Sequence, residues 1–285
     1  MSAITSEQVM SLRSQTGAGV MDCKNALKES AGDLAKAVEL LRKKGLAGLA
    51  KRAGRLMKEG VVSVKVSPDS KTLAMIEINC ETDFVAKNPD VRALAEELAG
   101  LMLTDASMAD PAEDAKSKER LQALAIKTGE NMQIRRGAVY HPAADAVVNY
   151  YIHSDHKKAA VVELSFDGDL NAAKNDLMAL AKELAMQSVA MNPKWLRRED
   201  VPADLIAKEQ EIYKASPAAA GKTGVGLAKM LEGRVNKFYQ ESCLLEQASI
   251  RDTKLSVAQV VKAHSDKLKG SVQVKKFDCY IVGME

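Results

Sequence analysis

The stretch that decides the fold runs from Val61 to Ala99 and reads VVSVKVSPDSKTLAMIEINCETDFVAKNPDVRALAEELA. When the chain is shifted by 86 residues (147 − 61), Val147–Ala185 aligns with it without a gap, and 15 of the 39 positions are identical. Two unrelated segments of ordinary composition would share about two or three such positions. The chain therefore contains an internal duplication.

Each copy of the repeat has the pattern strand, turn, strand, loop, helix. The runs rich in β-branched and aromatic residues predict the strands, and the short polar clusters between them predict turns. The predicted strands are Val61–Val66 and Leu73–Ile78 in the first copy, and Val147–Ile152 and Ala159–Leu164 in the second. Helices are predicted to begin near Asp90 and Asp176. We therefore expect two α+β subdomains with small antiparallel sheets, packed as pseudo-symmetric halves.

The segment before the repeat predicts three short helices. The first begins at Ser6, and the second runs from about Met21 to Glu29. Gly17 and Gly19 separate them, because glycine is unfavourable inside a helix. Asp33 can cap the third helix. The stretch 43–60, which is basic and contains glycines, is expected to be a partly helical linker.

The segment after the second copy predicts an inserted pair of helices. Charged helical patterns over Asp204–Ser216 and Val225–Tyr239 suit an antiparallel hairpin. A helix over Val257–Ala263 and a strand over Ser271–Val282, which completes the second sheet, follow. The expected α+β organisation begins with the three helices and the linker in residues 1–54. The first core subdomain follows in 55–140, and the second begins in 141–203. The hairpin occupies 204–239, and 240–285 forms the remainder of the second subdomain.

Composition excludes several classes of protein. The 41 basic and 38 acidic residues nearly cancel, to a net charge of +3, which speaks against nucleic-acid binding through a basic face. No apolar run reaches the roughly 18 residues of a membrane span, and no signal peptide is visible. The four cysteines lie far apart and suggest neither disulfides nor a zinc site: Cys23, Cys80, Cys243 and Cys279. These features favour a cytoplasmic protein.

No motif predicts an enzyme or a cofactor. Ala220–Thr223 resembles the end of a phosphate-binding loop, but position 216 is Ser where that loop needs Gly, and no strand precedes it. His153 and His156 lack further ligands for a metal site and are better explained as surface residues at a turn. No convergent set of polar residues suits covalent or acid–base catalysis.

The loop after the second strand differs between the two copies. Asp83 and Asp169 correspond, but Phe84 corresponds to Leu170. Each aspartate can be explained as a cap of the following helix. An aromatic residue beside a charge at a loop tip is instead typical of an anchor that enters a partner's pocket. The sequence leaves both interpretations of the loop open.

Three stretches of the chain resemble signatures of the elongation factor Ts family. Leu12–Leu27 closely resembles its N-terminal signature, and Cys80–Asn88 resembles its second. Gly129–Asn131 with Ile134–Arg136 resembles a third. The matches occur in order over nearly the whole chain. The resemblance implies that the first three helices form a ubiquitin-associated-like domain and that the hairpin is a coiled coil.

The resemblance also implies a function and a set of contacts. Members of this family are guanine-nucleotide exchange factors that bind elongation factor Tu. The implied partner-binding residues are Arg13, Val20, Met21, Arg52, Asp83, Phe84, Gly129 and His153. The implied exchange wedge, Thr82–Val85, enters the partner near its magnesium and phosphate site. Val20 and Thr128 depart from the commonest family residues, Met and Ile, so the interface is expected to differ in detail there.

Such an exchange factor needs no nucleotide pocket, metal ion or nucleophile of its own. A GTPase holds its nucleotide through a phosphate-binding loop and a magnesium ion. A factor that binds the GTPase more tightly when those contacts are distorted gains a certain binding free energy. It weakens nucleotide binding by the same free energy. The alternative is a non-catalytic adaptor that uses only the N-terminal helices, which would leave the Asp83-Phe84 loop without a role.

Overall fold

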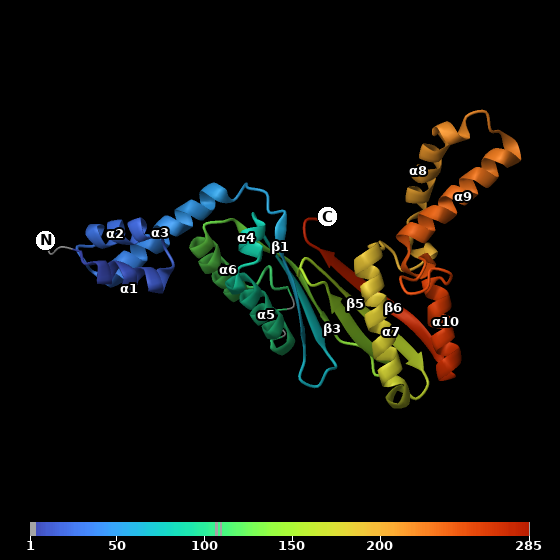
Figure 1. Ribbon diagram of the computed structural model, residues 1–285, viewed down its shortest axis with the longest axis horizontal. Helices are drawn as coiled ribbons and strands as arrows, with labels where there is room; N and C mark the ends of the chain where they lie inside the picture. Colours follow the sequence, from blue (N-terminus) through green and yellow to red (C-terminus); the bar gives the residue numbers. More distant parts are fainter. Residues whose placement is uncertain (1–3, 106–107, 109, 285) are drawn as a thin grey trace. The chain divides into compact units, whose positions relative to one another are not determined.

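The protein is an α+β structure with two three-stranded sheets, described here by a computed structural model for residues 4–105, 108 and 110–284. The chain divides into two compact units (Figure 1). The first comprises Met1–Ser67, Ala74–Val139 and Val282–Glu285, and the second comprises Pro68–Leu73 and Tyr140–Ile281. None of the helices in the described ranges is long and apolar enough to cross a bilayer.

The first unit begins with three helices that share a small core. They are α1 (Ser6–Thr16), α2 (Val20–Glu29) and α3 (Leu34–Arg52). Their buried residues form a cluster of their own: Val9, Leu12, Cys23, Ala26, Leu27, Ala37 and Leu41. Gly17 ends α1 with φ at 67°, in the left-handed region that glycine adopts without strain. The three predicted helices are thus confirmed.

The third helix is longer than the sequence suggests. α3 continues to Arg52, so much of the expected linker is helical, and only residues 53–58 lead without regular structure to the first strand. A Cβ atom on Gly45 would lie 2.5 Å from Cγ2 of Ile126 on α6 (Ala115–Thr128). Gly45 therefore allows α3 to pack closely on α6. This packing outweighs the low helix propensity of glycine.

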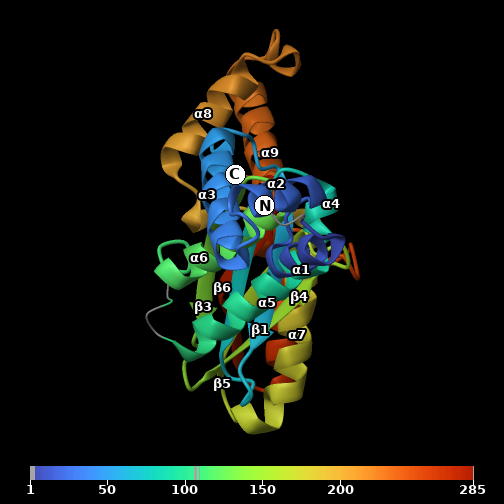
Figure 2. The same ribbon diagram turned by 90° about the vertical axis from the view of Figure 1, so that its left-hand side faces the viewer.

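The first sheet has the order β1 (Glu59–Val66), β2 (Leu73–Cys80), β3 (Met132–Tyr140). Ala74, Ile76, Ile78 and Cys80 alternate along β2 and belong to one hydrophobic core, as a period of two requires. The core also contains buried residues of α5 (Pro89–Thr104) and α6. Figure 2 shows α5 lying across β1.

The second unit is built around an antiparallel sheet of order β4 (Ala146–Ile152), β5 (Lys158–Asp167), β6 (Ser271–Ile281). The final strand predicted to complete this sheet is confirmed as β6. α7 (Leu170–Met191) packs against β4 and β5, and α10 (Val257–Leu268) packs against β6.

Two helices separate α7 from α10 in the chain. They are α8 (Ala203–Lys214) and α9 (Gly224–Ser242), and they lie side by side (Figure 1). Both lie within a few residues of the predicted segments. α8 contains no buried residue and α9 contains only Val235. Three short 3-10 turns flank them: Arg198–Asp200, Pro217–Ala219 and Leu244–Glu246.

The two copies of the repeat differ where the long helix begins. In the first copy a short helix, α4 (Asp83–Ala86), is separated from α5 by Lys87 and Asn88. Pro89 stands where the second copy has Asn175, and proline disfavours a helical residue before it. In the second copy α7 is continuous from Leu170. The predicted start near Asp176 is therefore wrong, because the Asp169 side chain caps the helix by accepting from the amides of Asn171 and Ala172.

Candidate partner-binding site

The most exposed large apolar side chain among the described residues is Phe84, on the one-turn helix α4. It is 81% exposed, whereas Ala86 is buried and Val85 packs against the first hydrophobic core. Thr82 caps the helix, with its hydroxyl oxygen accepting from the Val85 amide at 3.4 Å. The short helix thus fixes its inner side on the core and presents Phe84 outward.

The loop that leads into α4 is held by the carboxylate of Glu130. One oxygen accepts from the backbone amides of Glu81 and Thr82, both at 3.0 Å, and the other accepts from the Thr82 hydroxyl at 2.5 Å. Hydrogen bonds to an ionised acceptor are stronger than neutral ones. Glu130 belongs to the third signature stretch and Thr82 to the second, so the structure brings these two distant segments together.

The carboxylate of Glu81 in turn binds the residue that follows Glu130. It accepts from the Asn131 amide at 2.6 Å and from the Arg55 guanidinium at 3.2 Å. These interactions, the Asn131 bond first, lower the pKa of Glu81 below its ordinary value of 4.5. The Asn131 side chain in turn donates to the carbonyls of Ala53 and Arg55, at 3.3 and 3.4 Å. The two carboxylates thus tie together the linker, the loop before α4 and the end of α6.

Asp83, beside Phe84, forms an ion pair with Lys87 at 2.7 Å. Both side chains are substantially exposed. Such pairs one turn apart stabilise a helix by only about 0.3–0.5 kcal/mol.

The implied contact residues of the three-helix segment lie on its surface. Arg13 is exposed in the last turn of α1, and Val20 and Met21 begin α2 with 44% and 64% of their surface exposed. Met10, on α1, is also exposed, with 55% of its surface accessible.

Two further predicted contacts are Arg52 and Gly129. Arg52 ends α3, and its Nε atom is shielded from solvent without a hydrogen-bond partner in the described structure. Its charge contributes to lowering the pKa of Glu81, after the larger effects of Asn131 and Arg55. Gly129 is exposed and ends α6 in the left-handed conformation, with φ at 75°, directly before Glu130.

His153 belongs to the second unit. It follows β4, and its backbone amide donates to the Lys158 carbonyl at 2.9 Å. Its Nδ1 atom lies 3.1 Å from an oxygen of Asp155, and the side chain is about half exposed. Among the described residues, no group of three His, Cys, Asp or Glu side chains could hold a metal ion.

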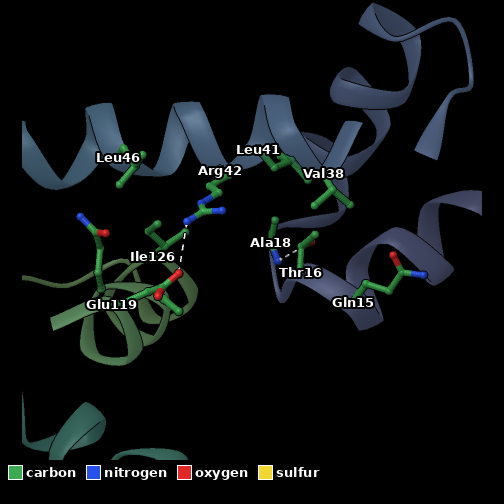
Figure 3. A pocket seen from close by; sticks show the side chains of 11 residues that line it. Gln15, Thr16, Ala18, Val38, Leu41, Arg42, Leu46, Glu119 and Ile126 are labelled. Atoms are coloured by element: carbon green, nitrogen blue, oxygen red, sulfur yellow. Dashed lines mark hydrogen bonds and ion pairs between the residues drawn. The ribbon is translucent and has the colours of Figure 1, made fainter. Parts of the chain in front are cut away.

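A cavity of about 290 Å³ lies between part of the three-helix segment and α6 (Figure 3). Val38, Leu41 and Leu46 line one wall, and Ile126 lines the other. Arg42 and Glu119 also line it, with the Arg42 guanidinium 3.5 Å from the Glu119 carboxylate and both side chains exposed. The walls are mainly apolar and lack a convergent set of polar groups, so this cavity does not resemble a nucleotide site.

Comparison with known proteins identifies the family. The family model described as elongation factor TS matches residues 81–284. The elongation factor Ts of Symbiobacterium thermophilum is 40% identical over 283 residues, covering 99% of this chain and 93% of its own. That of Chloroherpeton thalassium is 38% identical over 293 residues and covers 99% of both chains. The chain belongs to the elongation factor Ts family.

Membership of the elongation factor Ts family confirms the resemblance seen in the signature stretches. A third relative, from Trichlorobacter lovleyi, is 40% identical over 291 residues and covers 99% of this chain and 93% of its own. The family model includes the Thr82–Val85 loop, Gly129 and His153, whereas Arg13, Val20, Met21 and Arg52 precede its matched range. The relatives extend the likeness over that N-terminal segment.

Proposed function

We propose that this member of the elongation factor Ts family docks on elongation factor Tu and uses Asp83 and Phe84 as the wedge that loosens bound GDP. A guanine-nucleotide exchange factor of translation elongation is not an enzyme in the usual sense, because it changes no covalent bond. The observation that carries the wedge assignment is the 81% exposure of Phe84 on a short helix held against the core.

The mechanism follows from binding linkage. Elongation factor Tu holds GDP through a phosphate-binding loop and a magnesium ion, as GTPases do. The Phe84 ring enters between elements near that site, and the Asp83 carboxylate adds a negative charge there. Because the distorted partner binds the factor better, GDP binding weakens by the same coupling free energy. The reaction requires no cofactor or nucleotide on this chain.

The docking surface is broader than the wedge. Arg13, Val20 and Met21 contact the GTPase domain through a three-helix segment that we assign as ubiquitin-associated-like. Arg52, Gly129 and His153 extend the contact. The exposure of Val20 and Met21 supports this contact, because removing apolar side chains from water when a partner covers them lowers the free energy.

We also propose the domain boundaries that the sequence predicts. The three helices and linker occupy 1–54, the core subdomains occupy 55–140 and 141–203 with 240–285, and a coiled-coil hairpin occupies 204–239. The near absence of buried residues from α8 and α9 supports a projecting hairpin. The protein is proposed to work in the cytoplasm, without direct binding to nucleic acid or membrane.

Release of labelled GDP from elongation factor Tu tests the function. Trace amounts of the protein should accelerate the release of many equivalents of GDP in the presence of excess unlabelled nucleotide. Stoichiometric binding without faster release would instead show an adaptor. A nucleotide-free GTPase should also co-elute with the protein on gel filtration, and addition of GDP should dissociate the complex.

A further inference from the structure

The carboxylate pair formed by Glu81 and Glu130 is present in only one copy of the repeat. In the first unit, α6 ends at a left-handed residue, Gly129, and Glu130 follows immediately. In the second unit, α10 ends at a left-handed residue, Lys269, and Gly270 follows immediately. Both helices lead into the third strand of their sheet. Gly270 is therefore the structural equivalent of Glu130.

The residues that Glu130 binds are also replaced in the second copy. The shift of 86 residues places Gly168 at the position of Thr82, so the hydroxyl donor is missing. A Cβ atom on Gly270 would collide with the Asp167 carbonyl and with the Phe166 ring. A Cβ atom on Gly168 would lie 2.6 Å from the same ring. The second copy thus has neither the hydroxyl donor nor the space for a carboxylate.

In the second copy, backbone pairing between β5 and β6 holds the corresponding end of the sheet. Asp167 and Ser271 are cross-strand partners at the end of the β5–β6 ladder. Their equivalents, Glu81 and Asn131, lie outside β2 and β3, which end at Cys80 and begin at Met132. Where the first sheet has ended, the Glu81 side chain accepts from the Asn131 amide instead. Side-chain carboxylates therefore replace ladder bonds only in the copy that bears the exposed phenylalanine.

We propose that Glu130 is a positioning residue for nucleotide exchange, which holds the Glu81-Thr82 backbone so that α4 presents Phe84 in a fixed direction. This inference rests on the proposed exchange function. A helix of one turn is not stable by itself, because nucleation fixes several residues for a single hydrogen bond. α4 lacks the continuation that α7 has, since Pro89 separates it from α5. The three hydrogen bonds that the Glu130 carboxylate accepts fix the residues that lead into α4 instead.

The test separates orientation of the wedge from docking. GDP release from elongation factor Tu is measured at increasing concentrations of the full-length wild type, of Glu130→Gln and of Glu113→Gln. Glu113 is the matched control, an exposed carboxylate of the same unit that pairs only with Lys118 in the described contacts, at 2.7 Å. Glu130→Gln should lower the maximal release rate about tenfold and leave the half-saturating concentration within about twofold, because the docking surface is intact. Glu113→Gln should match wild type.

Hydrogen exchange provides a readout independent of activity. The amides of Glu81 and Thr82 should exchange faster in Glu130→Gln, while amides of β2 keep their protection. If Glu130→Gln does not fold, Thr82→Ser and Thr82→Val replace it, since only serine keeps the hydroxyl that donates to Glu130. The serine variant should then release GDP faster than the valine variant.

The outcomes distinguish this inference from the proposed function. A wild-type protein that does not accelerate GDP release would refute the exchange function itself. An active wild type with an unchanged maximal rate in Glu130→Gln would overturn the positioning role alone. A change confined to the half-saturating concentration would also overturn it, because Glu130 would then act in docking.

Discussion

Phe84 and Leu170 occupy the same position in the two copies of the repeat, yet only Phe84 points into solvent. Phe84 is 81% exposed, whereas Leu170 is partly buried against the second hydrophobic core. Leu170 begins the continuous helix α7, and Phe84 lies on the isolated turn α4. The duplicated fold therefore contains an internal control for the wedge.

Phe84→Ala should leave stability nearly unchanged and slow GDP release from elongation factor Tu. An exposed side chain contributes within about 0.5 kcal/mol to the free energy of unfolding. A hot-spot aromatic contributes about 2 kcal/mol or more to a partner contact, which corresponds to about a thirtyfold slower release. Thermal melts and stopped-flow release measure the two effects.

Leu170→Ala is the control for this substitution. It should destabilise the second unit by about 1–2 kcal/mol, less than a fully buried leucine, and should affect release much less than Phe84→Ala. Equal release rates for the two folded variants would refute the wedge assignment.

Deletion of residues 1–54 should weaken docking while the rest of the chain stays folded. The three helices have their own core, while Leu49 and Gly45 contact the first subdomain. We expect a higher half-saturating concentration in GDP release and a retained cooperative melt. Loss of the far-ultraviolet circular dichroism of the remaining core would show that the boundary is misplaced.

Shortening the α8–α9 pair should preserve much of the exchange activity. The replacement of residues 206–232 by a short Gly-containing turn retains Val235 and Phe238, and Phe238 contacts the Trp195 ring with centroids 5.9 Å apart. A deletion through Tyr239 would remove that contact and confound folding with function. If the folded shortened variant no longer accelerated GDP release at all, the helical pair would be part of the surface that acts on elongation factor Tu.

Glu81→Gln should destabilise the protein at neutral pH and much less in acid. The pKa of Glu81 is lowered in the folded state, so its stabilising effect is present above the ordinary value of 4.5. That effect disappears as the pH falls through the folded pKa, because the carboxyl group is then protonated in both states. Melting temperatures of both proteins between about pH 7 and pH 3 should converge toward the acid end. A constant difference across this range would contradict the assignment.

The isolated protein should bind neither GTP nor magnesium tightly. The Gly221-Lys222-Thr223 stretch follows a 3-10 turn rather than a strand, so it lacks the context of a phosphate-binding loop. Calorimetric titration should give no measurable heat of binding, and a micromolar dissociation constant for GTP would contradict the prediction.

Much of the fold could be predicted from local signals. The duplication located four of the six strands found in the described residues, and the sequence also predicted the final strand. Asp33 was identified as a cap, and its side chain accepts from the Lys36 amide at 3.1 Å. The third strand of the first sheet, β3, was not predicted, because it lies outside the aligned segments of the repeat. The family signatures marked Thr82–Val85 and Gly129 but did not show that their neighbours bind each other.

The sequence by itself determined the duplicated α+β plan, the Asp33 cap and the difference between Phe84 and Leu170, because these depend on residues close in the chain. Only the tertiary structure decided how the site is held. Glu130 and Thr82 are separated by 48 positions, and their hydrogen bond exists because α6 returns the chain to the end of β2. Gly45 remains helical for a similar reason, since contact with Ile126 outweighs its local preference. Such long-range contacts carry no periodic signal in a single sequence.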